Sequence, residues 1–377
     1  MLWVQCATER VLRRSGRHSP YESRAFPVPS TSDVHVLSTA PLISPNGLQS
    51  EMPITPAAAA TVLAGRKAIG DVLRGDDPRL LMIVGPCSIH DTAAAIEYAE
   101  RLLKLSKQVE DRLVVVMRVY FEKPRTTVGW KGMLNDPRLD GSFDIAEGLR
   151  TARRLLLQIN EMGLPCGTEF LDPIVPQYLA DLISWTAIGA RTTESQTHRE
   201  MASGLSMPVG FKNGTSGDTD IAVAAMIAAR SPHAFLGVDG DGQICVVNTK
   251  GNPDGHVVLR GGADGPNYDE ANVRDAQSRL AKAGLTERLL VDCSHANSNK
   301  DHQMQLVAFR DVVAQRSAGS TTIAGLMLES HLFPGAQKLG SDPAALQYGV
   351  SITDACIGWD ETEQLLLEAA GRLPLPA

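Results

Sequence analysis

The sequence predicts a (β/α)8 barrel with an N-terminal extension and one inserted β-hairpin. Three observations lead to this prediction. Eight short strand-like runs alternate with helical patterns between residues 80 and 373. Most of the runs are apolar throughout, as expected of strands that are buried on both faces. No G-x-G-x-x-G turn follows the first run, which disfavours the alternative of an open, doubly wound sheet.

The elements can be justified in chain order. A leading helix is expected over residues 57–75, before the first strand. The predicted strands are 80–85, 114–120, 165–170, 185–190, 209–212, 257–260, 289–293 and 323–329. Helical patterns lie between and after them, for example at 92–105, 145–162, 221–229, 272–283 and 361–373. Asp91, Asp144, Asp269 and Asp360 stand where helix N-caps are expected.

Two segments fall outside this alternation. Residues 235–238 and 243–248, joined by a glycine turn at 240–242, predict a β-hairpin between the fifth helix and the sixth strand. Seven prolines between residues 20 and 56 predict an extended, non-helical segment there. We therefore expect a flexible tail over 1–30, an extension with the leading helix over 31–76, and a catalytic barrel over 77–377 with a regulatory hairpin at about 235–250.

Composition excludes several classes of protein. The 377 residues carry 36 Lys and Arg against 43 Asp and Glu, a net charge of −7, which argues against a general nucleic-acid binder. No apolar run approaches the ~18–20 residues of a membrane span. The basic N-terminus is only superficially like a transit peptide, because Glu9 and Glu22 interrupt it. Six cysteines without a C-x-x-C pair predict reduced thiols and a cytoplasmic protein.

Cationic side chains gather at the predicted carboxyl ends of the strands, where barrel enzymes place their active sites. They are Arg118, Lys123, Arg125, Arg191, Lys212 and Arg260. Six cations at one mouth repel one another, so they require an anionic ligand, and arginine suits bidentate recognition of phosphate or carboxylate. The sequence therefore predicts a site that binds two or more anionic groups at once.

A second group of residues at the strand ends can bind a metal. It comprises Cys87, His295, Glu329 and Asp354, with His90 and His331 in reserve. These residues follow the first, seventh and eighth strands, which become neighbours when the barrel closes. One thiolate, one imidazole and two carboxylates suit a divalent transition metal such as Mn, Fe, Co or Zn, rather than Mg or Ca. The other cysteines considered, Cys166, Cys245 and Cys356, are expected to be structural.

Several motifs occur in the order of a known family. They are Gly-Pro-Cys-Ser at 85–88, Lys-Pro-Arg-Thr at 123–126, Gly-Ala-Arg at 189–191, Lys-Asn-Gly-Thr at 212–215, Leu-Arg-Gly-Gly at 259–262, Ser-His-Ala-Asn at 294–297 and Ser-Ile-Thr-Asp at 351–354. Over roughly residues 30–374 the chain resembles the class I 3-deoxy-D-arabino-heptulosonate-7-phosphate (DAHP) synthases, in particular their feedback-regulated subclass. That family condenses phosphoenolpyruvate with erythrose 4-phosphate and releases phosphate, the first step of the shikimate pathway.

The resemblance implies a role for each candidate residue. It assigns Arg118, Lys123 and Lys212 to the carboxylate region of phosphoenolpyruvate, Arg191 and Arg260 to its phosphate with the Ala190 amide and a water near Glu169, and Arg125 and Thr126 to the phosphate of the sugar. Cys87, His295, Glu329 and Asp354 match the family's metal ligands. Catalysis is expected to depend on Lys123, as a donor to the developing alkoxide, and on Cys87 and His295 through the metal, which polarises the aldehyde.

The resemblance also implies feedback inhibition by an aromatic amino acid. The matching pocket positions are Pro176, Gln177, Leu205, Ser206, Phe235, Gly237 and Val247. Phenylalanine-sensitive relatives tend to carry serine where this chain has Gly237, and a glycine leaves room for a larger ring substituent. We therefore expect tyrosine as the inhibitor, with tryptophan second. A homodimer or homotetramer is expected, without nucleic-acid or membrane partners.

Two alternatives stay open at the level of sequence. One is another enzyme that condenses phosphoenolpyruvate with an aldose on the same barrel, making an 8-carbon or sialic-type acid. The motif at 123–126 and the hairpin argue against it. The other is a catalytically silent sensor of amino acids, which would require the loss of a metal ligand or a cation, and none is lost.

Overall fold

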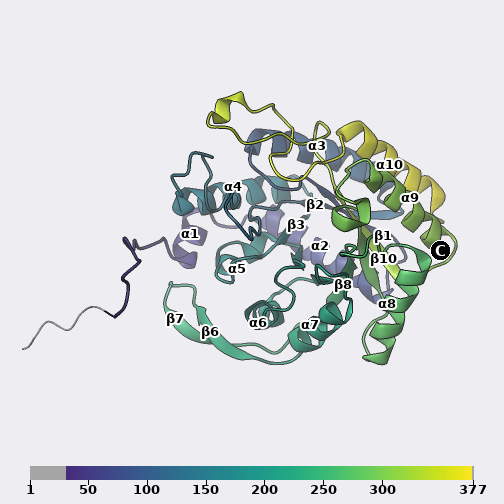
Figure 1. Ribbon diagram of the computed structural model, residues 1–377, viewed down its shortest axis with the longest axis horizontal. Coiled ribbons are helices and arrows are strands. Elements are labelled where there is room, and N and C mark those ends of the chain that lie inside the picture. The colour runs from purple at the N-terminus through teal and green to yellow at the C-terminus, as the bar shows by residue number, and fades with distance from the viewer. Residues whose placement is uncertain (1–30, 376–377) are drawn as a thin grey trace, which may run out of the picture. The chain divides into compact units, whose positions relative to one another are not determined.

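Eight parallel strands close into a barrel surrounded by helices (Figure 1). The strands are β1 (Leu80–Gly85), β2 (Leu113–Arg118), β3 (Cys166–Glu169), β4 (Trp185–Ile188), β5 (Val209–Lys212), β8 (Gly255–Leu259), β9 (Leu289–Asp292) and β10 (Ile323–Glu329). The barrel closes where β10 pairs with β1, in a register that places Glu329 opposite Gly85. The predicted fold class is confirmed, and three of the eight strands have the predicted bounds.

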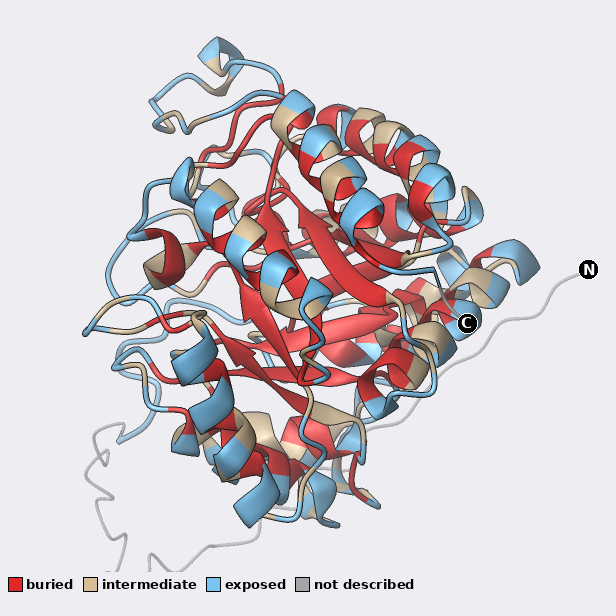
Figure 2. Ribbon diagram, turned by 90° about the vertical axis from the view of Figure 1, so that its right-hand side faces the viewer, coloured by how far each residue is buried: buried red, intermediate tan, exposed pale blue. Residues whose placement is uncertain are grey.

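One helix follows each strand of the barrel. These helices are α3 (Thr92–Val109), α4 (Ile145–Glu161), α5 (Val175–Leu179), α6 (Gln196–Gly204), α7 (Asp220–Arg230), α8 (Glu270–Lys282), α9 (Met304–Ser317) and α10 (Trp359–Arg372). In Figure 2 the strands of the barrel are almost entirely buried, whereas the helices alternate between buried and exposed residues. This pattern is that of amphipathic helices covering an apolar sheet.

Three of the four predicted helix caps are confirmed. The side chains of Asp91, Asp144 and Asp269 accept hydrogen bonds from backbone N–H groups in the first turns of α3, α4 and α8. The fourth prediction, Asp360, is wrong, because α10 is capped at Gly358 and Asp360 lies inside its first turn. Glu361 explains the earlier start, since its carboxylate accepts the Gly358 N–H at 2.7 Å.

A helix closes the amino-terminal end of the barrel. On α2 (Pro56–Arg74), Ile69, Val72 and Leu73 belong to the same buried apolar cluster as the inward-facing strand residues. The carbonyl of Val72 accepts a hydrogen bond from Arg288, directly before β9. Parallel strands share a direction, so α2 lies at their amino ends and leaves the carboxyl ends as the open mouth.

A short helix corrects the prediction for residues 20–56. The sequence indicated an extended segment, but α1 (Pro45–Glu51) is helical. Pro45 occupies a first-turn position of α1, where a missing N–H costs no intrahelical hydrogen bond, and Ser44 accepts the Gly47 N–H at 3.1 Å. Proline thus begins this helix rather than preventing it.

The predicted hairpin is confirmed in type and place. Strands β6 (Ala234–Val238) and β7 (Ile244–Asn248) pair antiparallel between α7 and β8, outside the barrel (Figure 1). Asp239 shapes the turn by accepting the backbone N–H groups of Asp241 and Gln243. The turn is held to α1, because Asn46 donates to the Gly240 carbonyl at 2.7 Å and to the Asp241 carboxylate at 2.8 Å.

The structure, a computed structural model, describes residues 31–375. It divides into two units, Met1–Leu42 and Ile43–Ala377, and all elements named above lie in the second. In the first, the Val36 N–H donates to the Asp33 carbonyl in a turn. The predicted tail at 1–30 and Pro20, Pro27 and Pro29 lie outside the described residues. None of the described helices is long and apolar enough to cross a membrane.

Candidate functional site

A cavity of about 250 Å³ lies at the carboxyl ends of the barrel strands. The structure brings five of the six predicted cations to its lining, namely Lys123, Arg125, Arg191, Lys212 and Arg260. Glu169, Ala190, His295, Glu329 and Asp354, also singled out in the sequence, line it as well. The five cations come from the loops or ends of four strands, so the closure of the barrel creates the concentration of positive charge.

The sixth cation, Arg118, is buried and does not line this cavity. Its side chain is fully buried, donates to Glu329 Oε1 at 3.1 Å, and stacks with its guanidinium carbon 4.0 Å from the centre of the Tyr120 ring. Burial disfavours the guanidinium charge, but Tyr120 and Glu329 outweigh it and raise the pKa of Arg118 above its usual value. Arg118 therefore neutralises the buried carboxylate of Glu329.

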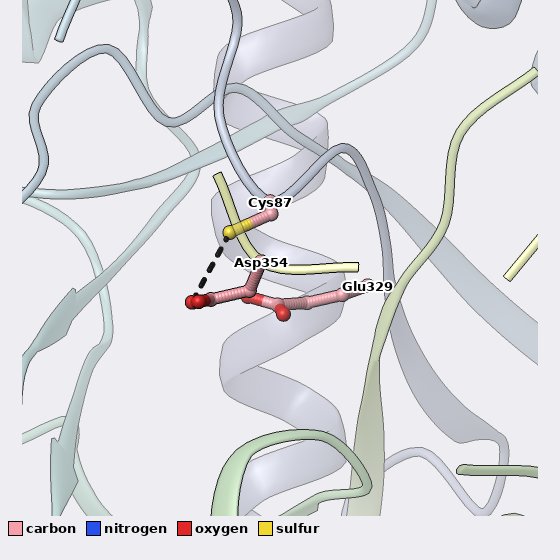
Figure 3. A group of neighbouring side chains, drawn as sticks. All are labelled: Cys87, Glu329 and Asp354. Carbon is pink, nitrogen blue, oxygen red and sulfur yellow. Dashed lines mark hydrogen bonds between the residues drawn. The ribbon is translucent and has the colours of Figure 1, made fainter. Parts of the chain in front are cut away.

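Three of the four predicted metal ligands form one compact group. The ligand atoms of Cys87, Glu329 and Asp354 all lie within 4.8 Å of one another (Figure 3). The Cys87 thiol lies 3.6 Å from Asp354 Oδ2. His295 stands outside this group, with its Nε2 atom 3.9 Å from Glu329 Oε1. A soft thiolate beside two carboxylates, faced by an imidazole nitrogen, is a donor set that fits a divalent transition metal.

The two reserve histidines lie apart from that group. The rings of His90 and His331 are 6.2 Å apart, and His331 also contacts Tyr98. Burial and the neighbouring His90 lower the pKa of His331 to about 4, and its Nδ1 atom accepts the Leu332 N–H. The Nδ1 atom of His90 is buried without a hydrogen-bond partner among the described residues, but neither ring joins the compact group of Cys87, Glu329 and Asp354.

Lys123 connects the cation group with the metal-capable group. Its Nζ atom donates to Cys87 Sγ at 2.9 Å and to the Cys87 carbonyl at 3.2 Å. Burial and Glu329 raise the pKa of Cys87 to about 11, although Lys123 opposes the shift. Burial also disfavours the ammonium form of Lys123, but Cys87, Glu329 and Asp354 outweigh it and raise its pKa. The thiol is thus protonated at neutral pH until a bound cation favours the thiolate.

Asp292 is a buried carboxylate that the sequence analysis did not single out. It ends β9, and its Oδ2 atom lies 2.8 Å from Lys212 Nζ and 3.0 Å from His295 Nδ1. Burial disfavours its charge, but Lys212 and His295 outweigh that cost and hold its pKa well below the usual range. An aspartate at a strand end, three residues before a candidate metal ligand, is the signal that would have identified it.

Other lining residues were also missed. Thr215, Ser298, Lys300 and His302 line the same cavity, and the last three follow His295 along the loop after β9. Their position after a strand was the available signal.

Two residues assigned to the sugar phosphate lie at or beyond the rim. Arg125 is exposed and donates to the Trp130 carbonyl at 2.9 Å, and Thr126 is exposed and does not line the cavity.

Glu169 depends on a neighbouring glycine for its place at the mouth. A Cβ atom on Gly189 would lie 2.2 Å from Glu169 Oε1, so a larger residue would displace this carboxylate. Glu169 is 7% exposed, and its Oε1 atom has no hydrogen-bond partner among the residues that the structure describes. An unsatisfied buried acceptor is costly, so this oxygen is available to a water or ligand donor.

The predicted effector positions lie around the hairpin but do not form one cavity. Leu205, Ser206 and Val247 line a cavity of about 580 Å³ between α6 and the hairpin. Phe235 and Gly237 lie on the same half-buried face of the hairpin as Val247 and do not line that cavity. Pro176 and Gln177 lie on α5, where the Gln177 carbonyl accepts a hydrogen bond from Gln49 of α1.

Comparison with known proteins gives a consistent result. The model of the DAHP synthetase I family matches residues 51–367. The chain is 54% identical over 337 residues to a Tyr-sensitive phospho-2-dehydro-3-deoxyheptonate aldolase of Escherichia coli K12, spanning 89% of this chain and 94% of that relative. It is 55% identical over 338 residues to the Phe-sensitive aldolase of the same organism, spanning 90% and 96%. A solved aldolase structure from Francisella tularensis SCHU S4 matches with a TM-score of 0.88 at 48% identity, covering 90% of this chain and 98% of that one.

Proposed function

Because the chain belongs to the DAHP synthetase I family, we propose that its barrel mouth condenses phosphoenolpyruvate with erythrose 4-phosphate and water. The products are DAHP and inorganic phosphate, in the first step of the shikimate pathway. One observation in the structure carries this conclusion. Five of the predicted cations, together with Lys300, line a single cavity whose lining also holds Glu329 and Asp354, so a site for phosphates and carboxylate directly adjoins a metal-capable site.

The cations divide between the two substrates according to their depth. Lys123 and Lys212 are buried beside the metal-capable group and the Asp292 carboxylate, so we assign them to the carboxylate end of phosphoenolpyruvate. Arg191 and Arg260 lie in the same cavity and would bind its phosphate. The exposed Arg125, with Thr126, would bind the phosphate of erythrose 4-phosphate at the rim. Holding two anions in a fixed mutual orientation removes most of the entropic cost of their reaction.

Lys123 is the residue we assign to proton transfer. Its ammonium group touches Cys87 and is stabilised there by nearby carboxylates, so it stays protonated at neutral pH. Carbon–carbon bond formation places negative charge on the aldehyde oxygen, and a buried ammonium can donate a proton to it. Water then adds at C2 of the former phosphoenolpyruvate, and the resulting hemiketal phosphate releases inorganic phosphate. The free Oε1 of Glu169 is positioned to accept a hydrogen bond from a water in the cavity.

A divalent transition metal, Mn, Fe, Co or Zn, would be held by Cys87, His295, Glu329 and Asp354. When bound, it would supply Lewis-acid polarisation of the acceptor aldehyde. Supporting this assignment, three of the donors already lie within 4.8 Å of one another, and the fourth presents Nε2 to Glu329.

A steady-state assay with both substrates, with and without a chelator, tests the function. We expect activity that a chelator abolishes and that added Mn²⁺ restores. Arabinose 5-phosphate offered in place of erythrose 4-phosphate should not react, and if it reacts better the enzyme belongs to the rival 8-carbon class. Cys87→Ala should abolish metal-dependent activity, whereas Cys245→Ala, in the hairpin, should retain it. A fully active Cys87→Ala protein would contradict the ligand assignment.

For feedback regulation we propose tyrosine as the effector. Overall identity does not select the amino acid, because the Tyr-sensitive and Phe-sensitive relatives match at 54% and 55%. The proposal rests on Gly237 and on the hairpin cavity that Val247 lines. A Cβ on Gly237 would lie 2.5 Å from Val247 Cγ2, so a serine there would push the valine aside and reshape this face.

Titrating activity with each aromatic amino acid tests the choice of effector. Tyrosine should inhibit most strongly, and inhibition by phenylalanine alone would refute the proposal. Gly237→Ser should change the potency of the inhibitor without changing the uninhibited rate. Leu367→Ser, on the exposed face of α10, is the matched control and should change neither.

We further propose a homodimer or homotetramer in the cytoplasm. The outer face of the hairpin supports assembly, because Leu236, Ile244 and Val246 are 80%, 82% and 63% exposed. An apolar face of this kind gains stability when a second chain covers it. A reducing compartment agrees with the cysteines among residues 31–375, which are all free thiols.

A further inference from the structure

The buried carboxylate of Asp292 contacts residues from both parts of the candidate site. Its side chain is fully buried, and both of its carboxylate oxygens have polar partners. Oδ1 accepts the Ser294 N–H at 3.0 Å and the Ser294 hydroxyl at 2.6 Å. Oδ2 lies 2.8 Å from Lys212 Nζ and 3.0 Å from His295 Nδ1. One carboxylate oxygen therefore contacts both a candidate substrate cation and a candidate metal ligand.

These contacts fix where the proton of the His295 ring lies. The Ser294 hydroxyl hydrogen is used on Asp292, so the serine oxygen presents a lone pair to His295 Nδ1, 2.7 Å away. The other neighbour of Nδ1 is the Asp292 carboxylate, which only accepts hydrogen bonds. Nδ1 must therefore carry a proton, and in the neutral ring Nε2 keeps its lone pair on the side of Glu329.

The backbone at His295 shows that this placement is imposed. Its φ angle is +59°, in the left-handed region that few residues other than glycine adopt. Such a conformation persists only where surrounding contacts hold it. Asp292 and Ser294 supply those contacts, because both bond to the ring that the turn presents.

We propose that Asp292 is the positioning residue that joins the two halves of the site. It holds His295 in the Nδ1-protonated form, with Nε2 available to a metal, and at the same time it holds Lys212 in the anion cavity. This inference rests on the proposed function for the identity of the substrate that Lys212 meets. It makes the metal site and the phosphoenolpyruvate site depend on a single carboxylate.

The test is Asp292→Asn, which keeps the shape and removes the charge. Competition with a chromophoric chelator should show Mn²⁺ affinity lowered by about 10–100-fold, as is typical when such a partner of a metal-bound histidine is lost. The KM for phosphoenolpyruvate should rise in the same variant, because Lys212 loses its anchor. Asp269→Asn is the matched control, since asparagine also caps a helix, and it should change neither value. An Asp292→Asn protein with wild-type Mn²⁺ affinity overturns the proposal.

The chelator competition uses no substrate, so it decides the role of Asp292 at the metal separately from the condensation assay. A wild-type protein that binds no Mn²⁺ overturns this proposal and the metal assignment together. Should Asp292→Asn fail to fold, the ring ¹⁵N signals of the metal-free wild-type protein provide a second measurement. His295, identified by its missing signals in His295→Gln, should be protonated at Nδ1, and a ring protonated at Nε2 alone overturns the proposal.

Discussion

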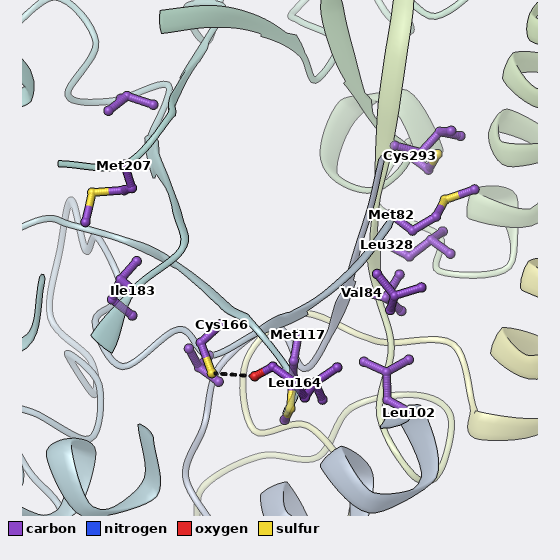
Figure 4. Close-up of a cluster of buried hydrophobic side chains, with 14 of the residues drawn as sticks. Met82, Val84, Leu102, Met117, Leu164, Cys166, Ile183, Met207, Cys293 and Leu328 are labelled. Atoms are coloured by element: carbon purple, nitrogen blue, oxygen red, sulfur yellow. Dashed lines mark hydrogen bonds between the residues drawn. The ribbon is translucent and has the colours of Figure 1, made fainter. Parts of the chain in front are cut away.

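The wall of the barrel and its mouth are built from neighbouring residues of the same strands, yet they differ completely in chemistry. Apolar side chains fill the layer between strands and helices, among them Met117 and Leu328 (Figure 4). The next residue on each of these strands turns into the barrel and is charged, Arg118 on β2 and Glu329 on β10. Phe211 and Lys212 on β5 show the same change.

The comparison shows how one fold separates stability from function. Side chains alternate along a strand, so a shift of one residue is enough to move from an apolar layer to a charged one. The apolar layer of the wall must be filled without cavities, and apolar residues of similar size can replace one another there. At the mouth, each buried charged side chain needs a partner of opposite charge. Lys212 with Asp292 and Arg118 with Glu329 are such pairs.

The largest expected effect is at the mouth. Lys123→Met should lower kcat by roughly 10²–10⁴-fold, because the site loses its proton donor, while the midpoint of thermal unfolding changes little. Steady-state kinetics and calorimetry measure the two quantities. Lys67→Met, an exposed lysine on α2, is the control and should retain full activity. An active Lys123→Met protein would remove Lys123 from the mechanism.

The wall should behave in the opposite way. Leu328→Ala should reduce the free energy of unfolding by about 2–5 kcal/mol, because it leaves a cavity in the fully buried layer. Activity per folded molecule should stay the same at low temperature. Denaturant titration measures the loss, and Leu328→Met, of similar volume, should lose less than about 1.5 kcal/mol. If Leu328→Ala loses activity without losing stability, wall and mouth are not separate.

Glu122 is a buried carboxyl group that lies between the two regions in sequence, directly before Lys123. It is 5% exposed and accepts backbone hydrogen bonds from Leu171 and Asp172, yet burial raises its pKa to about 8, with Asp172 and Glu169 adding to the shift. The folded state then holds a proton that the unfolded state releases near its ordinary pKa. Stability from this group is present below that ordinary value and is lost as pH rises toward 8.

The measurement for Glu122 is the free energy of unfolding across pH. Between pH 6.5 and 7.5 the wild-type protein should lose up to about 1.4 kcal/mol through this carboxyl. Glu122→Gln cannot titrate and should show a correspondingly flatter profile. Glu363→Gln, on α10, serves as the control, and a profile for Glu122→Gln that follows the wild type would show that the shift is absent.

The smallest effect on stability is expected at the outer face of the hairpin, which is apolar like the wall but exposed like the mouth. Leu236→Lys should change the free energy of unfolding of one chain by less than about 0.5 kcal/mol. It should nevertheless weaken self-association, which analytical ultracentrifugation measures. Leu367→Lys, an exposed leucine on α10, should leave association unchanged. Equal association of both variants with the wild type would exclude the hairpin as the interface.

The sequence predicted the wall better than the mouth, for physical reasons. Continuous apolar runs can form little else than buried strands, so the eight strands were found, and the bounds of β10 were predicted correctly. The order of residues in the sequence does not show how deeply each side chain is buried at the mouth of the barrel. Arg118 and Arg125 are equivalent in the sequence as strand-end cations, but Arg118 is buried in an ion pair with Glu329 and Arg125 is exposed at the rim.

Contacts between side chains explain the remaining differences. Asp292 gains its importance from Lys212 and His295, of which Lys212 lies 80 residues away along the chain. The cap of α10 is Gly358 rather than the predicted Asp360, because the Glu361 carboxylate accepts the Gly358 N–H. Pro45 favours a helix rather than breaking one, because the effect of a proline depends on whether it stands at the start of a helix or within it.

The seam between β1 and β10 has a consequence for synthesis of the protein. It joins the first barrel strand to the last, and Cys87 meets Asp354 across 267 positions of the chain. A ribosome synthesises the chain from the amino end, so β1 cannot pair with β10 until the last strand of the barrel has been made. The metal-capable group cannot assemble on a nascent chain until residue 354 has left the exit tunnel. Loading of the ion would therefore mark a chain that extends at least to residue 354, and a product truncated before residue 329 would carry the thiol without its two carboxylate neighbours.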